Sequence, residues 1–214
     1  NKVGGDSFTY TATDPAGNVS REATVTIQII KPADAAMYTD TAGTDCQFTA
    51  EWLRNTGIFA GEQVGGECCF APGKSVTRGE FLVMTMKALG IQGDSQAQTT
   101  GFEDDCPAWL KPYLAAAQRS GLVRGYATET GAEFRADLPI TGAEAAAIVS
   151  CALDLPAAVI SEDRELPVWA ATALATVNNS GFALSNTETV TRGEAANALY
   201  RAVQVMQESS SAKK

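Results

Sequence analysis

The sequence predicts a mainly α-helical fold of three helix-loop-helix units in a row, preceded by a short β-hairpin. Two observations lead to this prediction. A Thr-x-x-Glu motif occurs three times, each time followed by apolar residues at helical spacing, and strictly alternating residues near the N-terminus indicate the hairpin. Because two short helices cannot bury their apolar faces alone, the three units must pack on one another.

Composition limits the class of protein. The chain has 214 residues, 45% hydrophobic and 19% charged, which is enough for one large domain or two small ones. Sixteen Lys and Arg against 25 Asp and Glu give a net charge of −9, so we expect no nucleic-acid binding through a basic surface. The sequence has no histidine and its five cysteines fit no CxxC pattern, so we expect neither a metal site nor a cofactor.

The ends of the chain and its apolar runs concern targeting. The longest apolar stretch, within residues 145–153, is far shorter than the ~20 residues that cross a bilayer, so we expect no transmembrane segment. The chain begins at Asn1 with neither a methionine nor an apolar signal segment. We therefore expect a piece of a longer precursor whose export signal lies upstream.

The first element is the hairpin, in residues 1–31. Residues 7–13 and 23–29 alternate in polarity, and residues 14–18 have the composition of a turn. Two strands are marginal alone, so we interpret them as the last strands of a β-sandwich. They resemble the end of bacterial immunoglobulin-like or cadherin-like repeats. An ordinary hairpin packed on the next domain is the alternative, and residues 32–36 are the expected linker.

The three units follow at residues 37–95, 96–156 and 157–207, and residues 208–214 are expected to be a disordered tail. In the first two units a glycine precedes the motif threonine by 20 residues, and a phenylalanine precedes it by seven. In the third unit the glycine precedes the threonine by only ten residues, so its loop is shortened. The residues are Gly57, Phe70 and Thr77, then Gly121, Phe134 and Thr141, then Gly181 and Thr191.

Each glycine is a natural left-handed residue after the first helix of its unit. The apolar face of that first helix is marked by Phe48, Ala50 and Leu53, by Trp109, Tyr113, Leu114 and Ala117, and by Trp169, Ala173, Leu174 and Val177. We expect Trp109 and Trp169 to be core anchors, with a platform for stacking sugars as the alternative. Trp52 is out of register with both, so we expect it to be partly exposed at a groove.

The second helix of each unit begins with a capping box, in which threonine and glutamate satisfy each other's backbone amides. The pairs are Thr77 and Glu80, Thr141 and Glu144, and Thr191 and Glu194. Arginine follows the threonine at Arg78 and Arg192, where a cation opposes the helix dipole. A guanidinium beside helix-terminal amides is a good receptor for a carboxylate or phosphate, whereas a surface ion pair is the alternative.

In the order and repetition of these motifs, residues 37–205 resemble the S-layer homology family in its form of three tandem modules. The resemblance rests on the openings 38–40 and 102–104, the segments 57–61 and 121–126, the loops after Phe70 and Phe134, and the three helix starts. It implies a pseudo-threefold helical domain of a secreted surface protein that binds a secondary cell-wall polysaccharide, often with pyruvate ketals. Two features depart from the family pattern: Gly142 replaces arginine, and the third loop is short.

The resemblance and the motifs together select a set of ligand-binding candidates. These are Arg78, Arg192, Arg124, Gly125, Tyr126, Trp52 and Gly61. We expect the groove at Arg78 to be the principal site and the groove at Arg192 to be weaker. Since the net charge is −9, an acidic polymer must bind at discrete pockets, which screening over ~8 Å permits.

Two other functions compete with anchoring. A module for self-assembly of a surface layer, without glycan binding, fits the same repeats. A glycoside hydrolase using Glu80 and Glu144 fits least, because the capping boxes already occupy both carboxylates. We therefore expect no enzymatic activity.

The cysteines and two aspartates complete the expectations. We predict disulfides from Cys106 to Cys151 and from Cys46 to either Cys68 or Cys69, on the argument that antiparallel helices bring the first two together. Asp40 and Asp104 are expected to pin the openings of their units, since no loop of evenly spaced oxygen ligands surrounds them.

Overall fold

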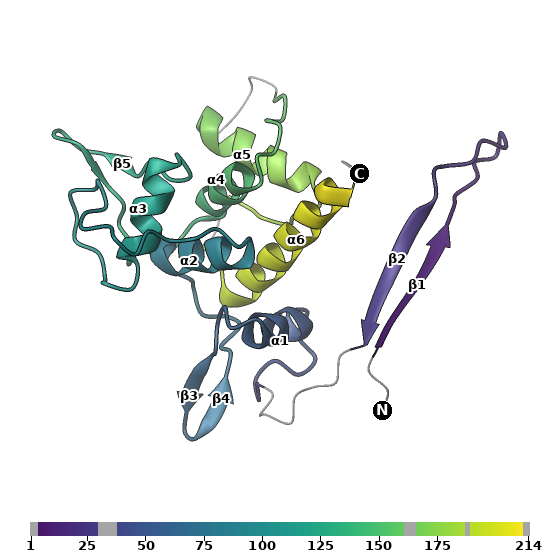
Figure 1. Ribbon diagram of the computed structural model, residues 1–214, viewed down its shortest axis with the longest axis horizontal. Coiled ribbons are helices and arrows are strands. Elements are labelled where there is room, and N and C mark those ends of the chain that lie inside the picture. The colour runs from purple at the N-terminus through teal and green to yellow at the C-terminus, as the bar shows by residue number, and fades with distance from the viewer. Residues whose placement is uncertain (1–3, 30–37, 161–165, 187–188, 212–214) are drawn as a thin grey trace. The chain divides into compact units, whose positions relative to one another are not determined.

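The computed structural model describes residues 4–29, 38–160, 166–186 and 189–211. The chain divides into two compact units, Asn1–Met37 and Tyr38–Lys214. Each is described by itself (Figure 1). The expected linker at 32–36 lies outside the described residues.

The N-terminal unit is the predicted hairpin of strands β1 (Gly4–Tyr10) and β2 (Ala23–Ile29). The strands are antiparallel, with Phe8 opposite Val25 and Thr9 opposite Thr24. Alternation therefore puts Phe8, Tyr10 and Val25 on one face and threonines on the other. Phe8 and Tyr10 are each 53% exposed. The hairpin is confirmed, whereas its origin in a larger β-sandwich stays a prediction.

In the described residues of the second unit six helices follow one another, and we name them as three pairs in sequence order. The pairs are α1 (Gln47–Asn55) with α2 (Arg78–Ala88), α3 (Lys111–Arg119) with α4 (Gly142–Ala152), and α5 (Val168–Asn179) with α6 (Arg192–Ser211). The mainly α-helical composition is thus confirmed. Small hairpins fill the first two loops, β3 (Glu62–Val64) with β4 (Glu67–Cys69), and β5 (Tyr126–Ala127) with β6 (Ala132–Glu133). Sequence reasoning treated these hairpins as loops.

The glycines after the first helices have the predicted left-handed conformation. Gly57, Gly121 and Gly181 have φ values of 70°, 74° and 82°. The amide after Gly57 donates to Leu53 O, and the amide after Gly121 donates to Ala117 O, which satisfies helix-terminal carbonyls. These turns fix where each loop leaves its helix.

Helix α6 completes the core of the first helix pair. Ala196 and Leu199 of α6 lie fully buried in one cluster with Ala50, Leu53 and Phe70. Thr49 of α1 donates to Asn197 of α6 at 2.6 Å. Accordingly α6 runs beside α1 and α2 (Figure 1), so the last helix in sequence packs against the first.

Three backbone hydrogen bonds link the residues that precede the three capping threonines. Val76 N donates to Val190 O, Val190 N donates to Ile140 O, and Ile140 N donates to Val76 O, at 2.9, 2.9 and 3.0 Å. All three side chains are buried. The bonds form a closed ring that joins all three helix pairs.

Four predictions about burial and order are wrong. Trp109 and Trp169 are 51% and 55% exposed, and Phe48 is 48% exposed. Trp109 precedes the first residue of α3, and the buried stripe of α5 runs through Ala170, Ala173 and Val177, one residue away from Trp169. The expected tail at 208–214 is helical through Ser211, where Arg201 pairs with Glu208 at 2.9 Å, and residues 212–214 lie outside the described residues.

Candidate functional site

The second helix of each pair begins against the loop of another pair, and we call these contacts junctions. The first junction joins the start of α6 to residues 59–74, the second joins the start of α2 to residues 126–138, and the third joins the start of α4 to residues 183–186, 189 and 190. At the second junction the amides of Arg78 and Gly79 donate to Leu138 O and Ala136 O, both at 2.9 Å. At the first, the amides of Arg192 and Gly193 donate to Lys74 O and Pro72 O. The helix-terminal amides that were expected to receive an anion thus already have partners.

Arg78 is enclosed at the second junction. Its side chain is 7% exposed, Nε donates to Phe134 O at 2.9 Å, and Nη1 lies 3.0 Å from Glu144 Oε1. The guanidinium carbon lies 4.8 Å from the ring centres of both Tyr126 and Phe134. The structure therefore brings the predicted residues Arg78 and Tyr126 together, with the arginine buried beneath the tyrosine.

Glu144 serves two purposes at the second junction. It completes the capping box of α4, and it accepts a hydrogen bond from Tyr126 Oη and forms an ion pair with the Arg78 guanidinium. Burial alone would raise the pKa of this carboxyl, but the hydrogen bonds from Thr141 and Tyr126 and the charge of Arg78 outweigh burial, and the pKa is lowered. Burial, and then the bond to Glu144, raise the pKa of Tyr126. At neutral pH Glu144 is ionised and Tyr126 is protonated.

Arg135 covers the outer side of Tyr126. Its guanidinium carbon lies 4.5 Å from the ring centre, and Nε lies 3.0 Å from Glu133 Oε2. The side chains of Arg135 and Glu133 are 42% and 38% exposed. Arg135 was not among the predicted site residues. It directly follows Phe134, the phenylalanine that recurs in the first two loops, and this position is the signal that could have found it.

The first junction holds Arg192, which is 2% exposed. Nη1 donates to Phe70 O at 2.7 Å, Nη2 donates to Glu62 Oε1 at 2.5 Å, and the guanidinium lies 4.7 Å from the centre of Phe59. Lys74 Nζ also contacts Glu62 Oε1, at 2.6 Å. Hydrogen bonds from Lys74 and then Arg192 lower the pKa of Glu62. Glu62 follows Gly61 as Tyr126 follows Gly125, which is the sequence signal that would have found it.

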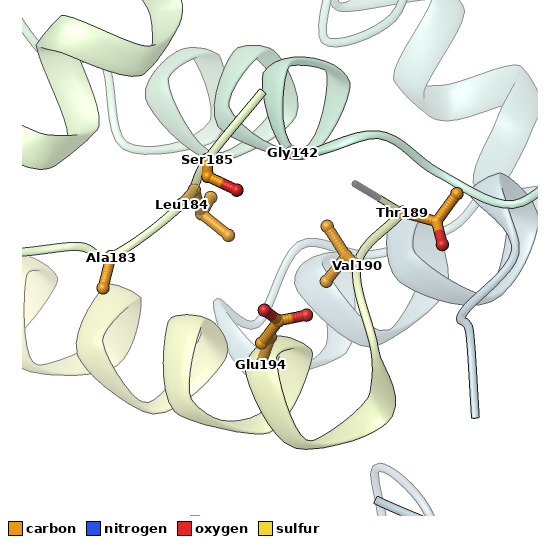
Figure 2. A pocket seen from close by; sticks show the side chains of 7 residues that line it. All are labelled: Gly142, Ala183, Leu184, Ser185, Thr189, Val190 and Glu194. Carbon is orange, nitrogen blue, oxygen red and sulfur yellow. The ribbon is translucent and has the colours of Figure 1, made fainter. Parts of the chain in front are cut away.

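The third junction explains the glycine at 142. A Cβ on Gly142 would lie 1.7 Å from Ser185 O, so any side chain there meets the backbone of the shortened third loop. A small pocket lies here, lined by Gly142, Ala183, Leu184, Ser185, Thr189, Val190 and Glu194 (Figure 2). Figure 2 shows the Glu194 carboxylate rising from α6 toward this space. The two departures from the family pattern are therefore one feature, since the short loop occupies the place of the arginine.

Matching residues hold the first two loops in one shape. Asp40 accepts the amides of Phe70 and Ala71 at 2.8 and 2.7 Å, and Asp104 accepts those of Phe134 and Arg135 at 2.7 Å each. This is the pinning role expected of both aspartates. Ala71 and Arg135 have φ values of 54° and 59°, a left-handed conformation that these bonds stabilise.

Gly61 and Gly125 are required by packing. A Cβ on Gly61 would lie 2.3 Å from Tyr38 Cε1, and a Cβ on Gly125 would lie 2.5 Å from Glu133 O. Each glycine also has a positive φ, of 82° and 71°. Their predicted contact with ligand stays a prediction.

All three capping boxes are present. Thr77, Thr141 and Thr191 each accept the amide of their glutamate, and Glu80, Glu144 and Glu194 each accept the amide of their threonine. These bonds occupy Glu80 and Glu144, the two carboxylates considered for hydrolysis.

The remaining predicted residues are Arg124 and Trp52. Arg124 is exposed on the loop after α3. Trp52 is half-buried on α1, and its ring centre lies 5.4 Å from that of Tyr200, which also contacts Phe48. The structure thus does not join Trp52 to the Arg78 cluster.

The predicted disulfides are absent, and all five cysteines are free: Cys46, Cys68, Cys69, Cys106 and Cys151. Cys151 Sγ lies 3.5 Å from Gly121 O, at the end of α3, whereas Cys106 precedes the start of α3. A nine-residue helix is about 13 Å long, so the two sulfurs lie at opposite ends of α3. Cys68 Sγ instead accepts a hydrogen bond from Arg54 Nη1.

The described residues contain neither a metal-binding cluster nor a membrane-spanning helix. In that part of the chain no group of three or more Cys, Asp or Glu side chains is placed to hold a metal ion. Nor does any helix within the described ranges have the length and apolar character to span a membrane.

Part of the chain is similar to known proteins. Residues 104–146 match the S-layer homology domain. The chain is 31% identical over 128 residues to a cellulosome-anchoring protein of Acetivibrio thermocellus, which covers 56% of this chain and 27% of the relative. It is 31% identical over 74 residues to an S-layer protein of Bacillus thuringiensis subsp. finitimus, covering 35% of this chain and 9% of the relative.

The chain therefore spans about a quarter or less of these relatives' lengths. The matched domain and both relatives indicate a location at the cell surface or cell wall. Residues 104–146, which contain α3, the second loop and the start of α4, are the part of the chain that matches the S-layer homology domain.

Proposed function

We propose that this chain anchors a surface protein noncovalently to the bacterial cell wall, by binding a secondary cell-wall polysaccharide that carries acidic groups such as pyruvate ketals. The observation that carries the proposal is the S-layer homology domain at 104–146, together with a relative named as an anchoring protein. The pairing of each helix start with a neighbouring loop supports it, because it forms repeated surfaces where charged and aromatic side chains meet.

The proposal takes the three helix pairs as three modules around a pseudo-threefold axis. The ring of bonds among Val76, Ile140 and Val190 supports this arrangement, since each residue donates to one module and accepts from the other. The matching hydrogen bonds that Asp40 and Asp104 accept from loop amides support the equivalence of the first two modules. In the third module the short loop leaves a junction of different shape.

Exposed aromatic side chains supply surfaces for sugar rings. Trp109 and Trp169 occupy the same position relative to the glycines of modules two and three, and each is about half exposed. Tryptophan combines a large apolar face with a polar N–H, which suits contact with a sugar that is apolar on one side. Their exposure supports the stacking alternative over the core interpretation.

The test is binding to purified wall polymer. The protein is mixed with polymer before and after its acidic substituents are removed, and bound protein is measured after sedimentation. We expect binding to the intact polymer and a large loss after removal. Binding that survives removal would exclude the acidic groups as determinants, and absence of binding to intact polymer would contradict the proposal as a whole.

Self-assembly into a surface layer is the second candidate. The relative named as an S-layer protein favours it. Sedimentation of the protein without polymer separates the two functions, because a lattice-forming module assembles alone, whereas an anchoring module sediments only with polymer.

A further inference from the structure

The first and second junctions differ in how their charges are paired. At the second junction two arginines contact two carboxylates, since Arg78 pairs with Glu144 and Arg135 pairs with Glu133. At the first junction two cations share a single carboxylate oxygen, because Arg192 Nη2 and Lys74 Nζ both contact Glu62 Oε1. The carboxylates of Asp40 and Asp104 bind matching backbone amides in the two loops, so they do not alter the difference.

The first junction thus has one more positive charge than carboxylate in its ion-pair cluster. Arg192 is buried at 2% and holds Phe70 O, so its position is fixed. Lys74 is the solvent-facing member, with a side chain that is 55% exposed. The side chain of Glu62 is 37% exposed, so solvent reaches the pair. An ion pair as exposed as that of Lys74 and Glu62 contributes little to stability, so exchanging partners there costs little.

We propose that the first junction is the principal anion-binding site of the chain, where Lys74 contacts an acidic group of the ligand and Glu62 is an internal carboxylate that competes with it. This inference rests on the proposed function and reverses the expected order of the grooves, in which Arg78 came first. Arg192 is a positioning residue that holds Glu62 and the Phe70 loop. The ligand group is an anionic oxygen group, either a carboxylate or a phosphodiester.

Because Glu62 competes with the ligand, substitutions of Lys74 and Glu62 should change the affinity in opposite directions. Removing Lys74 weakens binding, because the exposed cation is lost. Replacing Glu62 with glutamine strengthens binding, because the side-chain oxygen still accepts from Arg192 while its negative charge disappears. A residue with a purely structural role would weaken binding or leave it unchanged in both variants.

The test compares Lys74→Gln, Glu62→Gln and the control Lys87→Gln, which removes an exposed lysine at the far end of α2. Affinity for purified wall polymer is measured by titration, and thermal melts check that each variant is folded. We expect Lys74→Gln to bind about three- to tenfold more weakly and Glu62→Gln about two- to fivefold more tightly, with Lys87→Gln equal to the parent. Lys74→Glu should bind more weakly still.

Two chemical treatments of the polymer identify the anionic group that Lys74 contacts. Mild acid removes ketals and hydrofluoric acid removes phosphodiesters, and the Lys74 effect should vanish with one treatment only. If Lys74→Gln and the parent bound the polymer with equal affinity, this inference would be overturned and the anchoring function would remain. A parent that binds no polymer would instead overturn the anchoring function and this inference with it.

Discussion

The backbone N–H of Val76 donates to the carbonyl of Val190, 2.9 Å away and more than a hundred residues later in the chain. Val76 immediately precedes the capping box of α2, and Val190 immediately precedes that of α6. A backbone bond at this point fixes the two helix starts relative to each other. The charged side chains of the junctions are therefore positioned by buried main chain, and substitutions near these helix starts should act on stability before they act on binding.

Gly142→Ala should destabilise the domain by about 2 kcal/mol or more. The new Cβ would lie 1.7 Å from Ser185 O, and a backbone atom cannot move aside as the end of a side chain can. The free energy of unfolding in urea measures the effect. Gly73→Ala is the matched control, since no atom lies within 4 Å of its Cβ, and equal stability of the two variants would contradict the close contact at the third junction.

Arg78→Ala should destabilise the domain by about 3–5 kcal/mol, because it leaves Glu144 without its cation in a site where that side chain is 12% exposed. Denaturant unfolding measures the loss. Arg119→Ala removes an arginine that is 61% exposed and paired with Asp94, and it should cost far less, because water screens such a surface pair. If the two variants were equally stable, Arg78 would not be the enclosed residue that the structure describes.

Stability should fall in acid partly through Glu144. Its folded pKa is lowered below the ordinary value of 4.5, so its contribution is fully present above about pH 4.5 and is lost as the pH falls through the folded value. In Glu144→Gln this part of the acid dependence disappears. Free energies of unfolding are measured between about pH 3 and pH 7, a range that includes the ordinary glutamate pKa. As the pH falls, they should decrease less steeply for the variant than for the parent. An unchanged slope in Glu144→Gln would contradict the lowered pKa of Glu144.

Thiol titration should find all five cysteines free in denaturant without reductant. In the native protein the exposed Cys151 should react first, and Cys46, which is 1% exposed, should react last. Peptide mapping after non-reducing digestion assigns each thiol. Discovery of a bridge from Cys106 to Cys151 would contradict the placement of Cys151 at the end of α3.

Local patterns allowed the helices, the caps and the turn glycines to be predicted, because each depends on a few neighbouring residues. Thr77 with Glu80 forms a capping box whatever the rest of the chain does. The environment of Arg78 was not accessible in this way, since its partners Phe134 and Glu144 lie 56 and 66 residues later. The sequence indicated that helix stability does not explain the arginine, but it did not show that the neighbouring module encloses it.

The prediction that the tryptophans near the helix starts are buried was wrong for a related reason. Trp169 was assigned to the core because tryptophan is apolar and lies four residues before the buried Ala173. Its exposure depends on which side of α5 faces the neighbouring helices, and the buried residues Ala170, Ala173 and Val177 place Trp169 off that side. The spacing of apolar residues in one helix does not give this orientation. The same limit applies to Glu62 and Lys74, whose shared contact needs the position of α6.

Closure of the core by α6 has a consequence for the order in which the domain can fold. Ala50 and Leu53 belong to a cluster that is completed only by Ala196 and Leu199, almost 150 residues later. A chain that emerges from a translocon N-terminus first therefore exposes an unfinished apolar surface on α1 until nearly the whole domain has appeared. Contacts between such distant residues slow folding, because a long loop must close before they form. Folding of this domain should thus be a late, cooperative event that follows export.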